Sequence, residues 1–216
     1  MSGPPFPAVV LAGGLSRRMG ANKAEVLLAG KPLLAHVLAR LGPQAEEIAI
    51  NSNDPCDSMG YARIADPLPD RPGPLAGIAA AMTFAETRAS HVLTVPVDSP
   101  FIPKDLGRRL GAALETLHAA AATGHAPAPH QAIAIASSSN RLHPVIAFWP
   151  TSLRHELVSW LAEGKSRKVM DFLEGRSIVT VEFPPFETPS GSFDPFFNVN
   201  TPQDLAAAEA FLATGS

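Results

Sequence analysis

The hydrophobic and polar positions of the chain change their period from one segment to the next. Short continuous apolar runs are typical of buried strands, whereas apolar residues spaced three or four apart are typical of amphipathic helices. The apolar runs predict strands over 7–11, 47–51, 62–66, 91–98, 132–136, 144–149 and 177–182. The remaining segments predict helices over 31–42, 74–85, 103–121, 151–163, 167–174 and 202–213. This alternation predicts an α/β protein, a single domain with a doubly wound, mostly parallel sheet.

Residues at the ends of these segments support the predicted boundaries. Pro32 stands at the start of one helix and Gly42 at its end, which is where each residue type is favoured. Thr201 caps the last helix, with Pro202 at its first position. The segment 91–98 is the richest in β-branched residues, so we expect it to form a central parallel strand.

The composition narrows the classes of function. The chain has 216 residues, of which 46% are hydrophobic and 17% are charged, and its formal net charge is −3. The apolar content argues against disorder, and the slight negative charge argues against general nucleic-acid binding. Its single cysteine, Cys56, excludes an internal disulfide framework and a Cys-based zinc cluster. We see no targeting signal and no apolar run of about 18 residues, so we expect a cytoplasmic protein without membrane contact.

A glycine-rich loop directly follows the first predicted strand. Gly13 and Gly14 let the backbone turn sharply and approach an anion, and Arg17, Arg18 and Lys23 add positive charge nearby. The spacing matches neither a P-loop nor the GxGxxG dinucleotide fingerprint. The loop could be an ordinary strand-to-helix turn with solvated arginines, but the cluster of basic residues favours a polyphosphate site.

A single carboxylate follows the most β-branched run. Asp98 would lie at the carboxyl edge of the sheet, where α/β proteins bind ligands. Magnesium commonly takes only one or two protein carboxylates, with substrate phosphates and waters as its other ligands. Asp98 could equally cap the proline-rich turn that follows it, and its position alone leaves both interpretations open.

Five motifs in order give the chain a resemblance to a known family. They are LAGGLSRRMG followed by Lys23, PGPLAGI (72–78), VPVDSPFIP (95–103), HPVIAFW (143–149) and FNVNTPQDL (197–205). Together they resemble the molybdenum cofactor guanylyltransferase family over essentially the whole chain. The resemblance implies a Rossmann-like nucleotidyltransferase fold, with a GTP-binding half over 7–105 and a pterin-substrate half over 106–216.

The resemblance also implies an activity and a set of site residues. GMP would pass from GTP to the phosphate of molybdopterin, with release of pyrophosphate and with Mg²⁺ bound by Asp98. The implied catalytic residues are Arg18, Lys23 and Asp98. The implied nucleotide contacts are Leu11, Ala12, Gly13, Lys23, Asn51, Asp66 and Asp98. The implied pterin contacts are Arg167, Lys168, Asn198 and Asn200, and client molybdoenzymes or cofactor-inserting proteins would be transient partners.

The chain departs from the family pattern at one position and leaves other functions open. The family usually has Asp immediately before the lysine of the loop, whereas this chain has Asn22, to which we assign no role. A pterin cytidylyltransferase, a sugar-nucleotide pyrophosphorylase or a non-catalytic cofactor carrier would fit much of the same pattern. We interpret His143, which precedes Pro144, as shaping the entry to a strand rather than titrating in catalysis.

Overall fold

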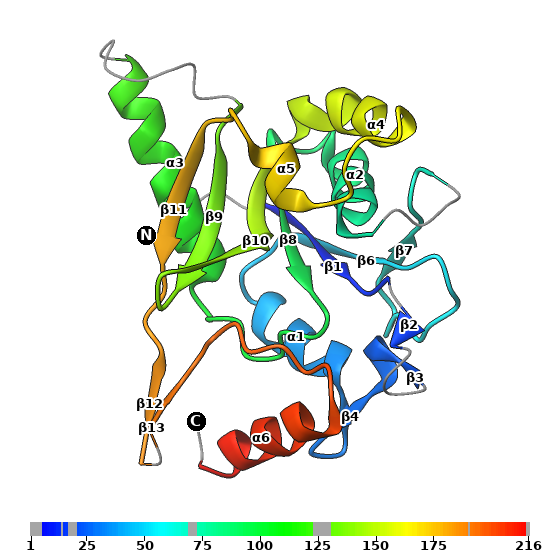
Figure 1. Cartoon of the computed structure of the whole chain (residues 1–216), viewed down its shortest axis with the longest axis vertical. Helices are drawn as coiled ribbons and strands as arrows, with labels where there is room; N and C mark the ends of the chain where they lie inside the picture. The colour runs from blue at the N-terminus through cyan, green and yellow to red at the C-terminus, as the bar shows by residue number, and fades with distance from the viewer. Residues whose placement is uncertain are drawn as a thin grey trace.

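A seven-stranded mixed sheet runs through the centre of the molecule (Figure 1). The structure, a computed structural model, describes residues 6–13, 15–16, 21–68, 73–122, 131–189 and 191–214. In sheet order the strands are β11 (Ile178–Glu182), β9 (Ile133–Ser138), β10 (Arg141–Pro150), β8 (His91–Pro96), β1 (Pro7–Leu11), β6 (Glu47–Asn51) and β7 (Ala62–Ile64). Only β10 runs antiparallel to its neighbours among these seven strands.

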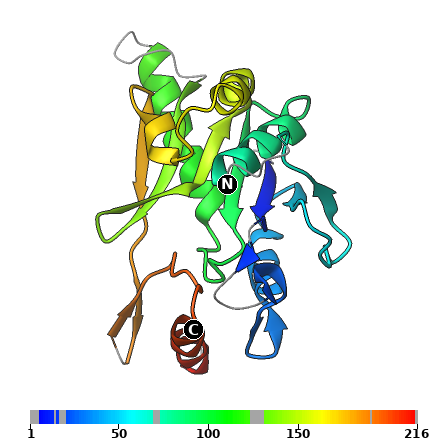
Figure 2. The same ribbon diagram turned by 45° about the vertical axis from the view of Figure 1, so that its right-hand side comes forward.

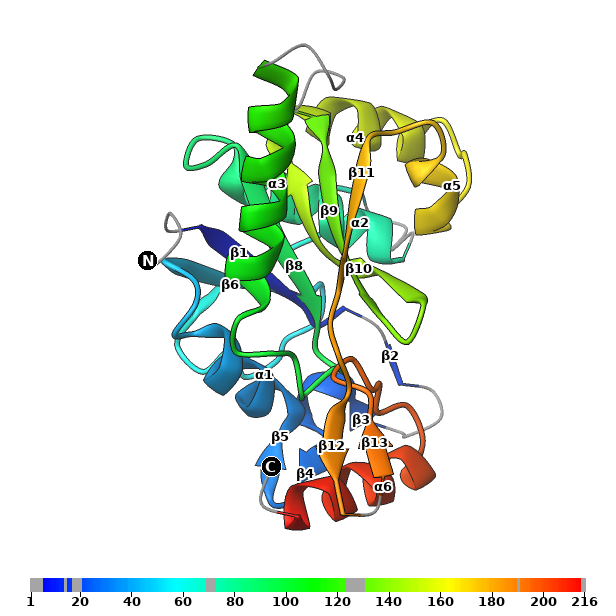
Figure 3. The ribbon, with the colours of Figure 1, turned by 90° about the vertical axis from the view of Figure 1, so that its left-hand side faces the viewer.

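Helices cover both faces of this sheet, as the predicted doubly wound arrangement requires. The helices are α1 (Leu33–Leu41), α2 (Pro74–Ala85), α3 (Leu106–Ala122), α4 (Arg154–Ala162), α5 (Val169–Leu173) and α6 (Pro202–Ala213). One apolar core joins α1 and α3 to the sheet, and a second joins α2, α4 and α5 to the opposite face. In β1, Val9 faces the second core and Val10 the first, because successive strand residues point to opposite faces. Figure 3 shows α3 on one face of the sheet and α4 with α5 on the other.

Each predicted strand and helix is present, with shifted boundaries that have local causes. The helix predicted over 31–42 starts at Leu33, because Lys31 and Pro32 form β5 (Lys31–Pro32), which pairs with β4 (Leu27–Leu28). The helix predicted over 103–121 begins at Leu106, whose amide donates to the carbonyl of Pro103 in a preceding turn. The helix predicted over 167–174 spans only α5, because Lys168 has an extended backbone. A 3₁₀ turn (Thr151–Leu153) opens the helix predicted over 151–163.

A third apolar cluster is separate from the two sheet cores. The C-terminal helix α6, which contributes to it, lies away from the seven-stranded sheet in Figure 2. Its rings belong to α6 and the segment before it, to the turn after β8 and to the hairpin of β12 (Phe186–Thr188) and β13 (Gly191–Phe193). Phe193 stacks on Phe211 with ring centroids 4.0 Å apart, and Phe101 meets Phe211 edge-on at 4.8 Å. We call this group the C-terminal cluster. The sequence patterns did not predict the short β12–β13 hairpin that contributes to it.

The last helix begins as its sequence predicts. The amide of Asp204 donates to Thr201 Oγ1 at 3.1 Å, and the amide of Thr201 donates to Asp204 Oδ2 at 2.9 Å. This reciprocal capping box fixes the angle at which the chain enters α6. Among the helices in the described part of the chain, none is both long and apolar enough to span a membrane.

Candidate active site

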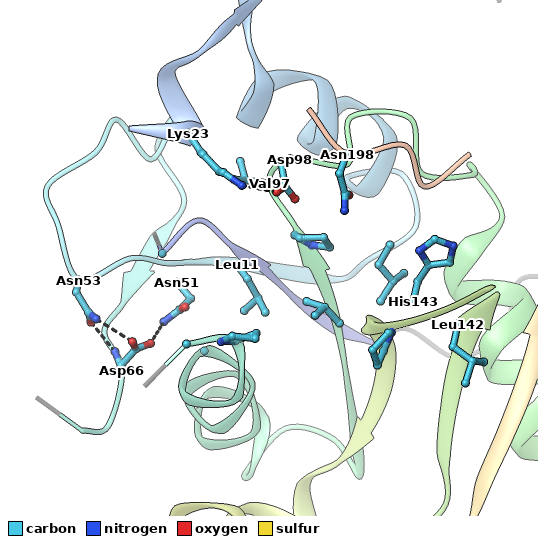
Figure 4. A pocket seen from close by; sticks show the side chains of 18 of the residues that line it. Leu11, Lys23, Asn51, Asn53, Asp66, Val97, Asp98, Leu142, His143 and Asn198 are labelled. Atoms are coloured by element: carbon cyan, nitrogen blue, oxygen red, sulfur yellow. Dashed lines mark hydrogen bonds and ion pairs between the residues drawn. The ribbon is translucent and has the colours of Figure 1, made fainter. Parts of the chain in front are cut away.

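A cavity of about 640 Å³ opens at the carboxyl edge of the central strands (Figure 4). Its walls come from the ends of β1, β6 and β8, the start of α2, the first part of β10 and the segment before α6. The lining residues are Leu11, Gly13, Lys23, Asn51, Asn53, Asp54, Asp66, Gly73, Pro74, Gly77, Pro96, Val97, Asp98, Asn198 and 141–146. This edge is where open α/β sheets bind ligands.

Strand register brings three of these segments to one level. Leu11 pairs with Asn51 of β6 on one side and with Pro96 of β8 on the other. Beyond the strands, the amide of Ala12 donates to the carbonyl of Asn51 at 2.9 Å. The amide of Val97 donates to the carbonyl of Leu11 at 3.1 Å. Parallel pairing thus places residues far apart in sequence at one edge, without side-chain contacts.

A carboxylate at one end of the cavity is held by two asparagines. Asn51 Nδ2 donates to Asp66 Oδ1 at 2.9 Å, and Asn53 Nδ2 donates to Asp66 Oδ2 at 2.8 Å. The amide of Asp66 donates in return to Asn53 Oδ1 at 2.8 Å. Each carboxylate oxygen can accept a further hydrogen bond, so Asp66 is a fixed acceptor for a ligand with N–H groups.

The first turns of α2 pass very close to the side chain of Asn51. A Cβ atom on Gly77 would lie 2.6 Å from Asn51 Oδ1 and 3.1 Å from a Leu11 methyl carbon. Gly73, which precedes α2, has a φ of +94°, a conformation that favours glycine. The PGPLAGI motif therefore lets α2 approach the strand ends without displacing Asn51.

A lysine and a carboxylate meet in the middle of the cavity. Lys23, at the start of the 3₁₀ turn η1 (Lys23–Glu25), places Nζ 2.7 Å from Asp98 Oδ2 and 2.5 Å from Asn200 Oδ1. The side chains of Lys23 and Asp98 are only 24% and 14% exposed. This partly buried pair places a positive and a negative charge side by side in the cavity. A polyphosphate could take the place of Asp98 beside Lys23, and a cation could take the place of Lys23 beside Asp98.

The chain before α6 is docked onto the turn after β8. Ser99 Oγ donates to Asn198 Oδ1 at 2.6 Å, and the amide of Val199 donates to the carbonyl of Asp98 at 2.8 Å. Val199 itself is buried in the C-terminal cluster. The FNVN part of the motif therefore completes the wall around Asp98 from about a hundred residues away in the sequence.

An irregularity in β10 forms the opposite wall. His143 pairs with Ala136 of β9, but the next pair is Ala147 with Ile135, so 144–146 have no partners on β9. Pro144 has no amide hydrogen to give to the ladder, which explains the break at that position. The strand bends there, and residues 141–146 line the cavity. Sequence reasoning identified the strand but did not predict the bulge.

The structure brings most of the predicted site residues together. Leu11, Gly13, Lys23, Asn51, Asp66, Asp98 and Asn198 line the cavity, and Asn200 contacts Lys23. Ala12 is buried behind the lining, where its amide bonds the strand beside it. Arg18 lies outside the described residues. Arg167 and Lys168 are exposed in the segment before α5 and are not among the residues that line the cavity.

Some lining residues were not predicted as site residues. Asn53 lies two residues after Asn51, and residues two apart in an extended chain point to the same side. The N-x-N spacing is therefore the sequence signal for Asn53. Arg141 and Leu142 reach the cavity only through the bulge in β10, for which Pro144 is the one sequence signal. Among the described residues no cluster of three or more His, Cys, Asp or Glu side chains could hold a metal by itself.

The fold matches that of nucleotide-transferring enzymes. The structure resembles 2-C-methyl-D-erythritol 4-phosphate cytidylyltransferase from Thermus thermophilus with a TM-score of 0.62 and 19% identity, over 97% of this chain and 100% of that one. It resembles molybdopterin-guanine dinucleotide biosynthesis protein A from Archaeoglobus fulgidus with a TM-score of 0.64 and 26% identity, over 96% and 99%. The fold is that of a nucleotidyltransferase.

Sequence comparison gives the family within that class. Residues 8–178 match the MobA-like NTP transferase domain. The chain is 44% identical over 212 residues to the molybdenum cofactor guanylyltransferase of Rhizobium meliloti strain 1021, which covers 95% of this chain and 91% of that protein. The chain belongs to the MobA-like NTP transferase family.

Proposed function

We propose that this protein transfers GMP from GTP to the terminal phosphate of molybdopterin, forming a guanine dinucleotide and releasing pyrophosphate. The observation that carries the proposal is that one and the same cavity holds the fixed Asp66 carboxylate at one end and the Lys23–Asp98 pair in its middle. The name of the Rhizobium meliloti relative supports the same activity.

Asp66 supports guanine as the base. The Watson–Crick edge of guanine carries adjacent N–H donors on the ring and on the exocyclic amine, which match a carboxylate. Cytosine presents a single amine beside an acceptor nitrogen, which a carboxylate would repel. Because Asn51 and Asn53 hold Asp66 through both oxygens, the carboxylate is oriented before the base arrives.

The middle of the cavity supports binding of the triphosphate. Lys23 and the backbone of 11–13 would contact the phosphates, and Arg18 would add a second positive charge. Asp98 fits a magnesium site. Lys23 Nζ donates a hydrogen bond to its Oδ2, whereas its Oδ1 accepts none from any described residue. One carboxylate with phosphate oxygens and waters is a common set of Mg²⁺ ligands. Bound there, Mg²⁺ would neutralise charge on the phosphates.

The remaining wall supports binding of the acceptor substrate. An oxygen of its phosphate attacks the α-phosphorus of GTP, and the bond from that phosphorus to the bridging oxygen breaks. The electron pair of that bond leaves with pyrophosphate. Two anions must approach each other, so positioning and positive charge matter more than a protein nucleophile. Asn198 and Asn200 would line the approach, and we retain Arg167 and Lys168 as candidate contacts for the acceptor phosphate.

Pyrophosphate release tests the proposal directly. We expect release with GTP, Mg²⁺ and molybdopterin together, with a guanine dinucleotide of the pterin detected by mass spectrometry. Faster release with CTP than with GTP would identify a cytidylyltransferase instead. Binding of GTP with no pyrophosphate released in the presence of molybdopterin would overturn the enzymatic proposal and favour a cofactor carrier.

A further inference from the structure

Three polar side chains form a connected row that begins at His143, which lines the cavity on the side far from Asp66. His143 of β10 has its Nε2 2.7 Å from Ser138 Oγ of β9, and Ser138 Oγ donates to Asp194 Oδ1 at 2.8 Å. Ser138 is fully buried and His143 is only 8% exposed. The row therefore ties the sheet to the C-terminal segment, since Asp194 lies four residues before Asn198.

The protons in this row can be placed by counting donors. Asp194 is a carboxylate and can only accept, so the single hydroxyl proton of Ser138 points toward it. Ser138 Oγ must then accept from His143, which places the imidazole proton on Nε2. The other ring nitrogen, Nδ1, is an acceptor, and it has no hydrogen-bond partner among the described residues.

The environment of the imidazole favours this neutral form. Burial lowers the pKa of His143 below its ordinary value, and the positive charge of Arg141 acts in the same direction. The carboxylates of Asp194 and Glu182 oppose this shift in pKa, but burial outweighs them. The ring also packs against Phe196 with centroids 4.7 Å apart, which fixes its plane.

The position of His143 indicates which substrate it meets. Figure 4 shows Asp66 with its asparagines at one side of the cavity, Lys23 and Asp98 between, and His143 with Asn198 at the other side. A nucleotide with its base at Asp66 and its phosphates at Lys23 leaves the His143 side for the second substrate.

We propose that His143 accepts, at Nδ1, a hydrogen bond from an N–H or O–H group of the acceptor substrate and so positions it for attack. This inference rests on the proposed function, in which the acceptor is molybdopterin. Ser138 and Asp194 are positioning residues, because they act on the substrate only through the imidazole.

Two substitutions separate this role from a purely structural one. In His143→Gln the side-chain amide reaches the Nε2 position and can keep the bond to Ser138, but nothing replaces the acceptor at Nδ1. In His143→Asn the amide oxygen lies near the Nδ1 position and the bond to Ser138 is lost. We expect His143→Gln to raise the KM for molybdopterin about tenfold, the scale of one lost hydrogen bond that leaves a donor unpaired, with the KM for GTP unchanged. His143→Asn is expected to raise it less.

The dependence on pH gives a second readout. Protonation of Nδ1 converts the acceptor into a donor, so the KM for molybdopterin should rise as the pH falls through the pKa of His143. In His143→Gln that part of the rise should disappear, while any rise from protonation of the molybdopterin phosphate remains. The same acid dependence in the wild type and in His143→Gln would overturn the proposal.

The remaining outcomes are distinct from a failure of the proposed function. Wild-type protein that releases no pyrophosphate refutes the proposed function, whereas an active wild type whose KM for molybdopterin is matched by His143→Gln refutes only this inference. The ribose hydroxyls are the other available donors. If His143→Gln raises the KM for GTP but not for 2′-deoxy- or 3′-deoxy-GTP, the donor is on the nucleotide, and the assignment to the acceptor substrate is wrong.

Discussion

The two sides of the cavity are built by different forces. On the strand side, the hydrogen-bond ladders of β1, β6 and β8 bring Leu11, Asn51 and Pro96 to one level. On the other side, Asn198 and Asn200 are held by side-chain bonds to Ser99 and Lys23, which lie 99 and 177 residues away. The C-terminal cluster supports that second side through stacked phenylalanines rather than through the sheet.

This difference indicates that the two sides have different roles in substrate binding and catalysis. The strand side is fixed by a cooperative sheet and suits the recognition of a nucleotide. The C-terminal side reaches the proposed phosphate and metal site, because Asn200 contacts Lys23 and the amide of Val199 donates to the backbone carbonyl of Asp98. We therefore expect changes on the strand side to alter mainly the KM for GTP, and changes on the C-terminal side to alter mainly kcat.

Asp98 is where both sides meet, so its removal should have the largest effect. We expect Asp98→Ala to lower kcat/KM by about 10³-fold or more, because both the proposed magnesium ligand and the partner of Lys23 are lost. Steady-state pyrophosphate release measures this, with circular dichroism to show that the fold persists. Asp105→Ala removes an exposed carboxylate that pairs with Arg108 at 2.9 Å, and it should retain full activity. Near-normal turnover of Asp98→Ala would refute the metal assignment.

Substitution of Lys23 should have the second-largest effect on activity. Its replacement by alanine removes a positive charge next to the proposed position of the phosphates, and we expect a loss of about 10²–10³-fold in kcat/KM. Lys104→Ala removes an exposed lysine and serves as the matched control. If the two variants have the same kcat/KM, Lys23 does not belong to the site.

A pair of glycines tests the strand side alone. Gly77→Ala would force Asn51 to move, since the new Cβ would lie 2.6 Å from its side-chain oxygen, and we expect about a tenfold rise in the KM for GTP. Gly111→Ala also lies in a helix, but its Cβ would meet nothing closer than 4.0 Å. That control should keep its KM and gain about 0.5–1 kcal/mol of stability. An equal KM in both variants would show that the position of Asn51 does not matter for GTP.

Asn200 tests the C-terminal side alone. Asn200→Ala removes an acceptor of Lys23 Nζ, and we expect kcat to fall about tenfold with little change in the KM for GTP. Gln203→Ala, an exposed change in the first turn of α6, is the control. A rise in the KM for GTP with normal kcat would contradict the division between the two sides.

The cap of α6 should give the smallest effect. Backbone amides of Asn200 and Thr201 hold the pKa of Asp204 below its ordinary value. A carboxyl group with a lowered pKa in the folded state stabilises the protein above its unfolded pKa, and this contribution is lost as the pH falls. Asp204→Ala should cost about 1 kcal/mol near neutral pH, measured by denaturant unfolding. The difference from the wild type should shrink below about pH 4; a constant difference would show that the charge is irrelevant.

The sequence predicted the strand side of the site better than the C-terminal side. Apolar runs identify buried strands, and parallel pairing then places Leu11, Asn51 and Asp98 near one edge without further information. The capping signal of Thr201 and Pro202 was equally local and was confirmed. Local patterns therefore predicted most of the fold.

Long-range side-chain contacts could not be predicted in the same way. No local signal pairs Lys23 with Asn200, and only the family resemblance placed the FNVN segment near the site. The bulge at Pro144 depends on where β10 meets β9, so the part of the cavity wall from Arg141 onward emerged only in three dimensions. The same bulge gives His143 a place on the cavity wall, where the sequence suggested only a role in shaping a strand.

A crystal structure of the wild-type protein with GTP and Mg²⁺ would show directly which end of the cavity takes the base and where the metal binds. We expect guanine against the carboxylate of Asp66, the triphosphate beside Gly13 and Lys23, and the metal on Asp98, with the His143 end left for the acceptor. A guanine base bound at the His143 end, or a metal bound away from Asp98, would contradict the proposed arrangement of the site.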